Sequence, residues 1–354
     1  MKKSNLILGS LFSILLITSC SDETSPVEPE RPIGDYENGY FVTNEGPFQN
    51  GSGSITFVGD DGVVAQNVYS TVNSEVLGNI VNSMHIADGI GYIVVNNSHK
   101  VVAVNRYTME KIADIEGFYI DNPRFFAAAD GKGYISNWGD PLNPDDDFIA
   151  VISLETFGLL NMIPVGEGPE RLLLQEKLLY VCLQGGYGNN NKVVVIDTND
   201  NSVAAGITVG DAPNSIVSAG SGDVWVLCGG SPSWTGNETP GTLYRIESGS
   251  YRTSFREFAL EEHPSLLSAE QNMLYYHLNG AVYRMGASDV ELPVEAIGGI
   301  SGFFYTMEVK DGQLYTTDAG DYASEGKLQV YNTGSGTLLE TIDAGIVPGN
   351  IVFP

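Results

Sequence analysis

The chain of 354 residues is poor in basic residues, in cysteine and in histidine. It has 17 Lys and Arg against 44 Asp and Glu, a formal net charge of −27, and only 17 % of its residues are charged. A protein that neutralises nucleic-acid phosphates needs clustered Lys and Arg, so we expect no nucleic-acid partner. The scarcity of charge also argues against helical bundles and coiled coils, which are rich in Ala, Glu, Lys and Leu.

Recognisable catalytic and metal-binding patterns are also missing. The chain has no G-x-S-x-G elbow, no phosphate-binding P-loop and no G-x-G-x-x-G fingerprint. Its four histidines are scattered, and none stands at metal-ligand spacing. Residues 145–147 are three consecutive Asp that could hold Ca²⁺, but they lack the alternating spacing of an EF-hand loop. We therefore expect a solvated acidic loop there, no metal, no cofactor and no enzymatic activity.

The first residues have the pattern of a bacterial lipoprotein leader. Two lysines at positions 2 and 3 precede an apolar stretch, residues 6–17, that is too short for an ordinary membrane span. The tetrapeptide ITSC that ends at Cys20 resembles a lipobox, in which the Cys is lipidated and becomes the first mature residue. We predict a signal peptide at 1–19 and a lipid anchor on Cys20. An ordinary secretory signal with a chance Cys is the alternative.

Residues 20–35 are rich in Pro and acidic residues, which predicts an extended, solvated tether. Acidic residues directly after the lipidated Cys resemble the surface-export signal of Bacteroidetes lipoproteins. We therefore expect a lipid-anchored outer-membrane protein at the cell surface that meets the membrane only through its anchor. A plain periplasmic tether is the alternative.

The rest of the chain, residues 36–354, carries an internal repeat of about 46 residues. In most copies an aromatic residue on an apolar strand is followed five residues later by Gly, as from Phe41 to Gly46. Four short strands with their turns need about this much chain. The pattern therefore predicts an all-β fold, a seven-bladed β-propeller with four-stranded blades. The aromatic positions are Phe41, Tyr92, Tyr134, Tyr180, Trp225, Tyr275 and Tyr315.

The two ends of this region predict how the ring closes. In four copies a proline that opens an apolar strand precedes the aromatic residue by 11 or 12 positions. Pro348 repeats this proline-strand pattern, but no aromatic strand follows it, whereas the strand at Phe41 has no proline strand before it. We expect the C-terminal strand to pair beside Phe41 and complete one blade, which leaves no open sheet edge.

Cys182 and Cys228 remain after Cys20 is assigned to the anchor. An oxidising compartment would permit a disulfide between them. Cys182 lies two residues after Tyr180, whereas Cys228 lies three residues after Trp225. Because side chains alternate along a strand, we expect the two thiols to point to opposite faces of neighbouring blades. The sequence therefore predicts two buried free cysteines.

Three segments of the repeat resemble a known family. They are GYFVTNEG at 39–46, GYISNWG at 133–139 and VWVLCGG at 224–230. These segments resemble the YncE-like seven-bladed propeller lipoproteins of Bacteroidetes, of the "surface layer protein" type, and the resemblance runs from about residue 35 to 354. That group includes the BtuG-type lipoproteins, which cap an outer-membrane transporter and capture cobalamin. The resemblance implies a corrinoid as a ligand and a TonB-dependent outer-membrane transporter as a partner.

Two sets of loops are expected on one face of the ring, namely those that follow each second strand and those that lead into each first strand. These loops are long and carry aromatic residues among Asn, Asp, Ser and Gly. Tyr and Trp offer contact area at low entropic cost, and Asn and Ser offer adaptable hydrogen bonds. The candidate ligand-binding residues on this face are Phe48, Tyr119, Arg124, Trp138, Arg171, Tyr187, Trp234, Phe304 and Tyr322.

We expect a monomeric, non-enzymatic module that captures a small molecule for a transporter, with Arg124 and Arg171 near the channel entrance. For the arginines, the alternative partner is a neighbouring acid such as Asp121 or Glu170. For the aromatic residues, the alternative is packing onto the edges of blades. Two other functions remain open, a surface scaffold or adhesin with a protein or glycan partner, and a propeller lyase or hydrolase.

Overall fold

The structure, a computed structural model, describes residues 34–354 with the exception of residues 49, 50, 141 and 221. The predicted signal peptide, Cys20 and most of the predicted tether lie outside the described residues. Within the described part of the chain, no helix is long and apolar enough to cross a membrane.

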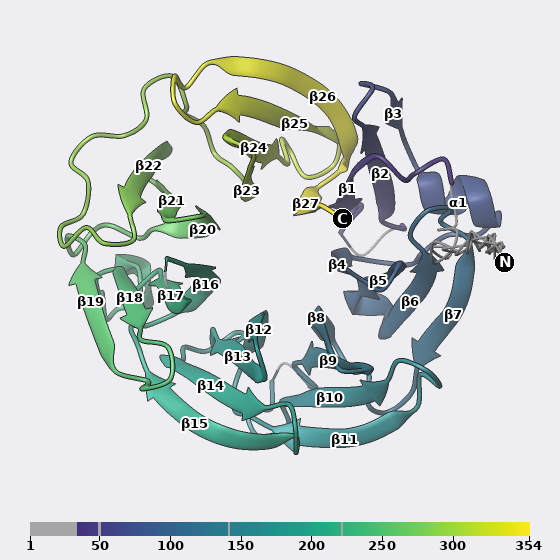
Figure 1. The fold of residues 1–354 in the computed structure, drawn as a ribbon, viewed down its shortest axis with the longest axis horizontal. Coiled ribbons are helices and arrows are strands. Elements are labelled where there is room, and N and C mark those ends of the chain that lie inside the picture. Colours follow the sequence, from purple (N-terminus) through teal and green to yellow (C-terminus); the bar gives the residue numbers. More distant parts are fainter. Residues whose placement is uncertain (1–33, 49–50, 141, 221) are drawn as a thin grey trace, which may run out of the picture. The chain divides into compact units, whose positions relative to one another are not determined.

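Seven antiparallel sheets surround a central axis as the blades of a propeller (Figure 1). Each blade runs from an inner strand at the axis to an outer strand at the rim. The first blade consists of β27 (Pro348–Val352), β1 (Gly39–Asn44), β2 (Ser54–Gly59) and β3 (Val64–Ala65). The second blade consists of β4 (Val81–Ala87), β5 (Ile90–Val95), β6 (Lys100–Asn105) and β7 (Lys111–Glu116).

The next three blades have the same arrangement. The third consists of β8 (Pro123–Ala129), β9 (Lys132–Asn137), β10 (Phe148–Ser153) and β11 (Leu159–Pro164). The fourth consists of β12 (Pro169–Gln175), β13 (Leu178–Leu183), β14 (Lys192–Asp197) and β15 (Ser202–Thr208). The fifth consists of β16 (Pro213–Ala219), β17 (Asp223–Cys228), β18 (Thr242–Ile246) and β19 (Thr253–Glu257).

The last two blades differ in their number of strands. The sixth has three, β20 (Ser265–Glu270), β21 (Met273–Leu278) and β22 (Ala281–Gly286), followed by a long irregular segment up to the next blade. The seventh has four, β23 (Thr306–Lys310), β24 (Gln313–Asp318), β25 (Glu325–Asn332) and β26 (Leu338–Ile346). The helices are short: α1 (Val68–Asn73), and the 3₁₀ turns η1 (Asn96–Ser98) and η2 (Ser233–Thr235). The predicted seven-bladed all-β propeller is confirmed.

The ring closes as the sequence predicts. The C-terminal strand β27 pairs with β1 in an antiparallel ladder that places Phe41 opposite Val352 and Val42 opposite Ile351. The first blade therefore joins the two ends of the propeller, and closure leaves no blade without a neighbour on either side.

The central strands of the first four blades are buried on both faces because a neighbouring blade covers each face, whereas β25 of the seventh blade has exposed residues among buried ones. In β14, the four apolar residues from Val193 to Ile196 are all buried, whereas the outer strand β15 is mostly exposed. A strand that is covered on both sides reads as a continuous apolar run rather than an alternation. This burial explains the run of β-branched residues in β14.

Cys182 and Cys228 are free and fully buried, as predicted. Both belong to one hydrophobic cluster between the fourth and fifth blades. Cys182 points from the fourth blade toward the fifth, and Cys228 points from the fifth blade toward the fourth. The two thiols therefore face opposite ways along the ring but lie in the same hydrophobic layer between the blades. Burial raises the pKa of the Cys228 thiol to about 12.

Candidate ligand-binding site

A cavity of about 720 Å³, here called the mouth pocket, opens where the inner strands begin. Its walls come from loops that follow the second strands β1, β5, β9, β13 and β24, and from residues that lead into inner strands. These are the two sets of loops that the sequence places on one face. The pocket is off-centre, because among the described residues none of its lining comes from the fifth or sixth blade.

A repeated backbone contact holds the two sets of loops together. In five blades the residue before the inner strand has a left-handed backbone, and its carbonyl accepts a hydrogen bond from the first amide after the second strand. Glycine fills this position in the fourth blade as Gly168, whereas Ile80 and Val347 hold it with φ of 60° and 53°. A positive φ is strained for a β-branched residue. Both of these strained residues line the mouth pocket.

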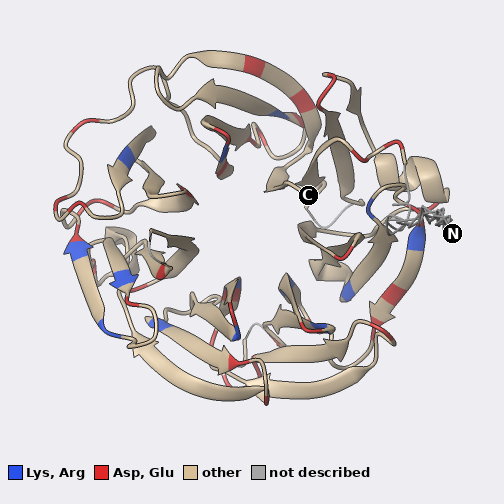
Figure 2. Ribbon diagram, in the orientation of Figure 1, with Lys and Arg blue, Asp and Glu red and all other residues tan. Residues whose placement is uncertain are grey.

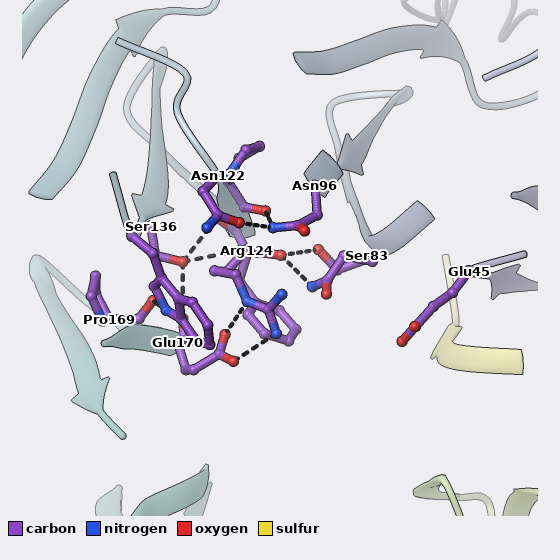
Figure 3. A network of polar contacts seen from close by, with 12 residues as sticks. Glu45, Ser83, Asn96, Asn122, Arg124, Ser136, Pro169 and Glu170 are labelled. Atoms are coloured by element: carbon purple, nitrogen blue, oxygen red, sulfur yellow. Dashed lines mark hydrogen bonds and ion pairs between the residues drawn. The ribbon is translucent and has the colours of Figure 1, made fainter. Parts of the chain in front are cut away.

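Arg124 and Glu170 form a bidentate ion pair at the pocket wall (Figure 3). The Arg124 guanidinium donates from Nε and Nη2 to the two Glu170 carboxylate oxygens at 2.9 and 2.8 Å. The same guanidinium lies over the ring of Trp138, 4.4 Å from its centroid. The Trp138 indole in turn donates to the carbonyl of Pro169 at 3.2 Å. The Arg124 guanidinium is therefore held by an ion pair with Glu170 of the fourth blade and by contact with the ring of Trp138 in its own blade.

Asparagine and serine side chains fix the backbone around Arg124. Its carbonyl accepts hydrogen bonds from Asn82 Nδ2 at 2.7 Å and from Ser83 Oγ at 2.8 Å. Asn96 donates to the Asn122 side chain and to the carbonyl of Pro123. These side chains link the second and third blades, and the three asparagines, Asn82, Asn96 and Asn122, also line the pocket.

Glu45 lies on the other side of the pocket. Figure 3 shows its carboxylate pointing across an open space toward the Arg124–Glu170 pair. Tyr305 Oη donates to Glu45 Oε1 at 2.7 Å. Burial raises the pKa of Glu45, while the Tyr305 hydrogen bond and the Arg124 charge act in the opposite direction. The pocket thus presents a guanidinium and a carboxylate that face each other without contact.

Aromatic side chains form two pairs at the rim. Trp138 and Tyr187 meet edge to face with centroids 6.2 Å apart, and Tyr305 and Tyr322 do so at 5.8 Å. Tyr187 is 77 % exposed, and Phe48 and Tyr322 are also exposed. Such rings offer flat apolar faces to a ligand beside the amides of the pocket wall.

The structure brings five of the nine candidate residues together in the mouth pocket and places the other four elsewhere. The five are Phe48, Arg124, Trp138, Tyr187 and Tyr322.

Each of the other four has its own surroundings. Tyr119 and Phe304 pack against hydrophobic clusters between blades. Trp234, in η2, is 85 % exposed and does not line the pocket. Arg171 lies deeper along the axis, with its guanidinium 4.5 Å from the centroid of the Phe125 ring.

Sequence reasoning missed Glu45, Tyr305 and the asparagines of the wall. Glu45 directly follows β1, and Tyr305 directly precedes β23, so both stand in the same kinds of loop as the predicted residues. The loop position that selected the aromatic residues and the arginines could therefore also have found them, had it been applied to acidic and amide residues and to every aromatic residue of these loops.

The acidic loop at 145–147 has no arrangement for a metal. Among the described residues, no group of three or more His, Cys, Asp or Glu side chains could hold a metal ion. The expectation of a solvated loop is wrong for Asp147, which is buried and whose Oδ2 accepts a hydrogen bond from the Gly168 amide at 2.5 Å.

Comparisons with known proteins identify a family and the fold. Residues 38–344 match the model of the family described as a domain of unknown function (DUF5074). No curated protein sequence matches the chain.

Solved structures of similar fold are distant in sequence. A quinonprotein alcohol dehydrogenase-like protein from Bacteroides thetaiotaomicron is 16 % identical, with a TM-score of 0.66 over 90 % of this chain and 78 % of that one. A hypothetical selenium-binding protein from Sulfolobus tokodaii is 12 % identical, with a TM-score of 0.65 over 88 % and 92 %. At such identities the likeness concerns the fold alone. Because the family model covers most of the chain, this seven-bladed propeller belongs to the DUF5074 family.

Proposed function

We propose that this propeller is a non-enzymatic module that captures a small organic ligand in the mouth pocket. One observation carries the proposal. Aromatic rings, amides and a facing guanidinium and carboxylate converge on a cavity of about 720 Å³, within the size range of small-molecule sites. Two strained β-branched residues at its wall add support, because backbone strain clusters at functional sites.

The charges of the pocket favour a neutral ligand with a flat face and a polar edge. Glu170 already balances the charge of Arg124, and Glu45 adds a further acid. A ring face would stack on Trp138, while hydroxyl or amide groups would bond to the asparagines and to Glu45. A corrinoid is the first ligand to test, because amides surround its flat macrocycle and because the resemblance to BtuG-type lipoproteins implies it.

The loops around the pocket also support a protein partner. Among the described residues, these loops carry Asp and Glu but no Lys or Arg. The Lys and Arg positions in Figure 2 lie mostly on strands. Exposed aromatic side chains also stand on the loops of this face, such as Phe48 at the pocket and Trp234 outside it. An acidic, aromatic-rich face fits a partner with a basic rim. We propose an outer-membrane transporter in this role and Cys20 as the lipid anchor at the cell surface.

Calorimetric titration with cobalamin tests ligand capture. Trp138→Ala should weaken binding about thirtyfold, the effect of losing a central aromatic anchor. Trp234→Ala is the matched control, since this tryptophan stands outside the pocket and its loss should leave affinity unchanged. Absence of binding by the parent protein would remove the corrinoid. Equal affinities of the parent and Trp138→Ala would place the site elsewhere.

Two further experiments test the partner and the anchor. A pulldown from detergent-solubilised outer membrane should recover a transporter, whereas recovery of another protein or of glycan alone would favour the scaffold. Cys20→Ser should release soluble protein, because the acyl chains would be its only hold on the membrane. Protease treatment of intact cells tests surface exposure, and protection of the wild-type protein would place it in the periplasm.

A further inference from the structure

A second cavity lies further along the axis, and the proposed capture of a ligand at the mouth makes no use of it. This axial cavity has a volume of about 440 Å³ and is lined by residues from all seven inner strands. The second residues of β4 and β8, Asn82 and Arg124, line the mouth pocket, and the axial cavity begins at the next residue of each strand, Ser83 and Phe125.

Besides His85, whose pKa burial lowers, the axial cavity contains one basic and one acidic side chain, Arg171 and Glu308. Both also line an adjoining recess of about 50 Å³. They come from β12 and β23, on opposite sides of the axis in Figure 1. No ion pair between them occurs in the described chain, although the Arg171 charge lowers the pKa of the Glu308 carboxyl against a larger increase caused by burial.

Arg171 and Glu308 each have polar atoms that bond to no described residue and could bond to a guest. Glu308 Oε2 accepts a hydrogen bond from Ser268 Oγ at 3.0 Å, and no described donor bonds its other carboxylate oxygen. Arg171 rests on the Phe125 ring, and its guanidinium makes no hydrogen bond to any described residue. Removing charges from water is costly unless a partner compensates them. The arrangement therefore favours a guest that supplies one anionic and one cationic group.

The rest of the lining is mixed, because polar residues such as Ser83, His85 and Asn350 stand beside apolar ones. Leu172, Leu173, Ile216 and Val217 line the cavity near Arg171, from the two adjacent inner strands β12 and β16. A guest that satisfies both charged groups thus also meets an aliphatic wall. A volume of about 440 Å³ admits a molecule of the size of an amino acid and its bound water.

We propose that the axial cavity is a second binding site, for a free α-amino acid with an apolar side chain. Arg171 pairs with the carboxylate of the amino acid, Glu308 pairs with its ammonium group, and the aliphatic wall holds its side chain. This site is independent of the mouth pocket, so its occupancy does not require that the mouth pocket binds a corrinoid.

The test is a titration of the wild-type protein with L-leucine and two analogues that each lack one charge, isoamylamine and 4-methylpentanoate. Leucine should bind, and each analogue should bind at least tenfold more weakly, because each leaves one charge of the cavity unpaired. No binding of leucine, methionine or phenylalanine at millimolar concentration would overturn the proposal. Equal binding of leucine and both analogues would overturn it as well.

Two substitutions then locate the site. Arg171→Met and Glu308→Gln should each weaken leucine binding at least tenfold. Arg252→Met serves as the matched control, because Arg252 is 77 % exposed beside Glu247 on a turn. The Arg252→Met variant should bind leucine with the affinity of the wild type. If both cavity variants bind leucine normally, the amino acid occupies another site and the proposal is wrong; if either variant fails to fold, the analogue series on the wild type still decides.

Discussion

Arg124 and Glu170 occupy equivalent positions in neighbouring blades and form a bidentate ion pair. Each directly follows the proline that opens its inner strand, and the two are 46 residues apart, one period of the repeat. Their side chains are 20 % and 8 % exposed. A propeller sets equivalent positions side by side, so opposite charges one period apart become a contact between blades.

This pair should show strong coupling in a double-mutant cycle. Arg124→Met or Glu170→Leu alone should lower the free energy of unfolding by about 3–5 kcal/mol, because each leaves the other charge buried without its partner. The double variant should recover a large part of that loss. Denaturant unfolding measures all four proteins, and additive effects of the two single variants would contradict the coupling.

An exposed ion pair provides the comparison. Arg252 and Glu247, with side chains 77 % and 37 % exposed, meet on the turn after β18. Water screens such pairs, and their loss typically costs only about 0.2–1 kcal/mol. If removal of the Arg252–Glu247 pair lowered the free energy of unfolding as much as removal of the Arg124–Glu170 pair, burial would not determine how much an ion pair contributes to stability.

The fold could be predicted because every blade must bury its strands against the blades on either side. A strand between two neighbouring blades must be apolar on both faces, so aromatic and β-branched runs recur at the period of the blade. The ends at Phe41 and Pro348 each lack the strand that the other supplies, which predicts the closure. The three-stranded sixth blade could not be predicted, because no residue pattern at 287–305 indicates that a regular fourth strand is missing.

The site was only partly predictable, because a loop assignment does not say where a side chain points. The rings of Tyr119 and Phe304 stand in the right loops but turn inward to the core. Arg124 directly follows its proline and lines the mouth pocket, whereas Arg171 is the second residue after its proline and lines the axial cavity. A single step along the inner strand therefore separates the two cavities, because the axial cavity continues over the next residues of the same strand, Leu172 and Leu173.

Ring closure by β27 should be essential for cooperative folding. Deletion of residues 347–354 removes the inner strand of the first blade and exposes the edge of β1. We expect the truncated protein to lose its single cooperative thermal transition, followed by circular dichroism. Deletion of the exposed Pro354 alone is the control and should leave the transition unchanged. A truncated protein that melts like its parent would disprove the closure argument.

The buried thiols should be inert in the native protein. Cys182 and Cys228 are each 0 % exposed, and burial raises the pKa of both, so the reactive thiolate is scarce. In a Cys20→Ser chain, a thiol reagent should label no cysteine before unfolding and both afterwards. The unfolding step is done without a reductant, and failure to label there would reveal a disulfide between the two cysteines.

Asp147 should make the stability of the protein depend on pH. It is 5 % exposed, and burial raises the pKa of its carboxyl from 3.8 to about 6, with Asp146 and Glu167 adding to the increase and the Gly168 hydrogen bond opposing it. Below its ordinary pKa the carboxyl is protonated in both the folded and the unfolded chain. As the pH rises to about 6, the unfolded chain ionises first, so the folded state loses stability until its own carboxyl ionises.

Asp147→Asn keeps the shape of the side chain but cannot ionise. The free energy of unfolding of the wild type, measured relative to this variant, should therefore fall between about pH 4 and pH 6 and stay level above that window. Denaturant unfolding at half-unit pH steps provides the measurement. Asp145→Asn, at an exposed position two residues earlier, controls for the loss of one formal charge from the same loop. A difference between the wild type and Asp147→Asn that stays constant or grows across the window would show that burial does not hold this carboxyl in its protonated form.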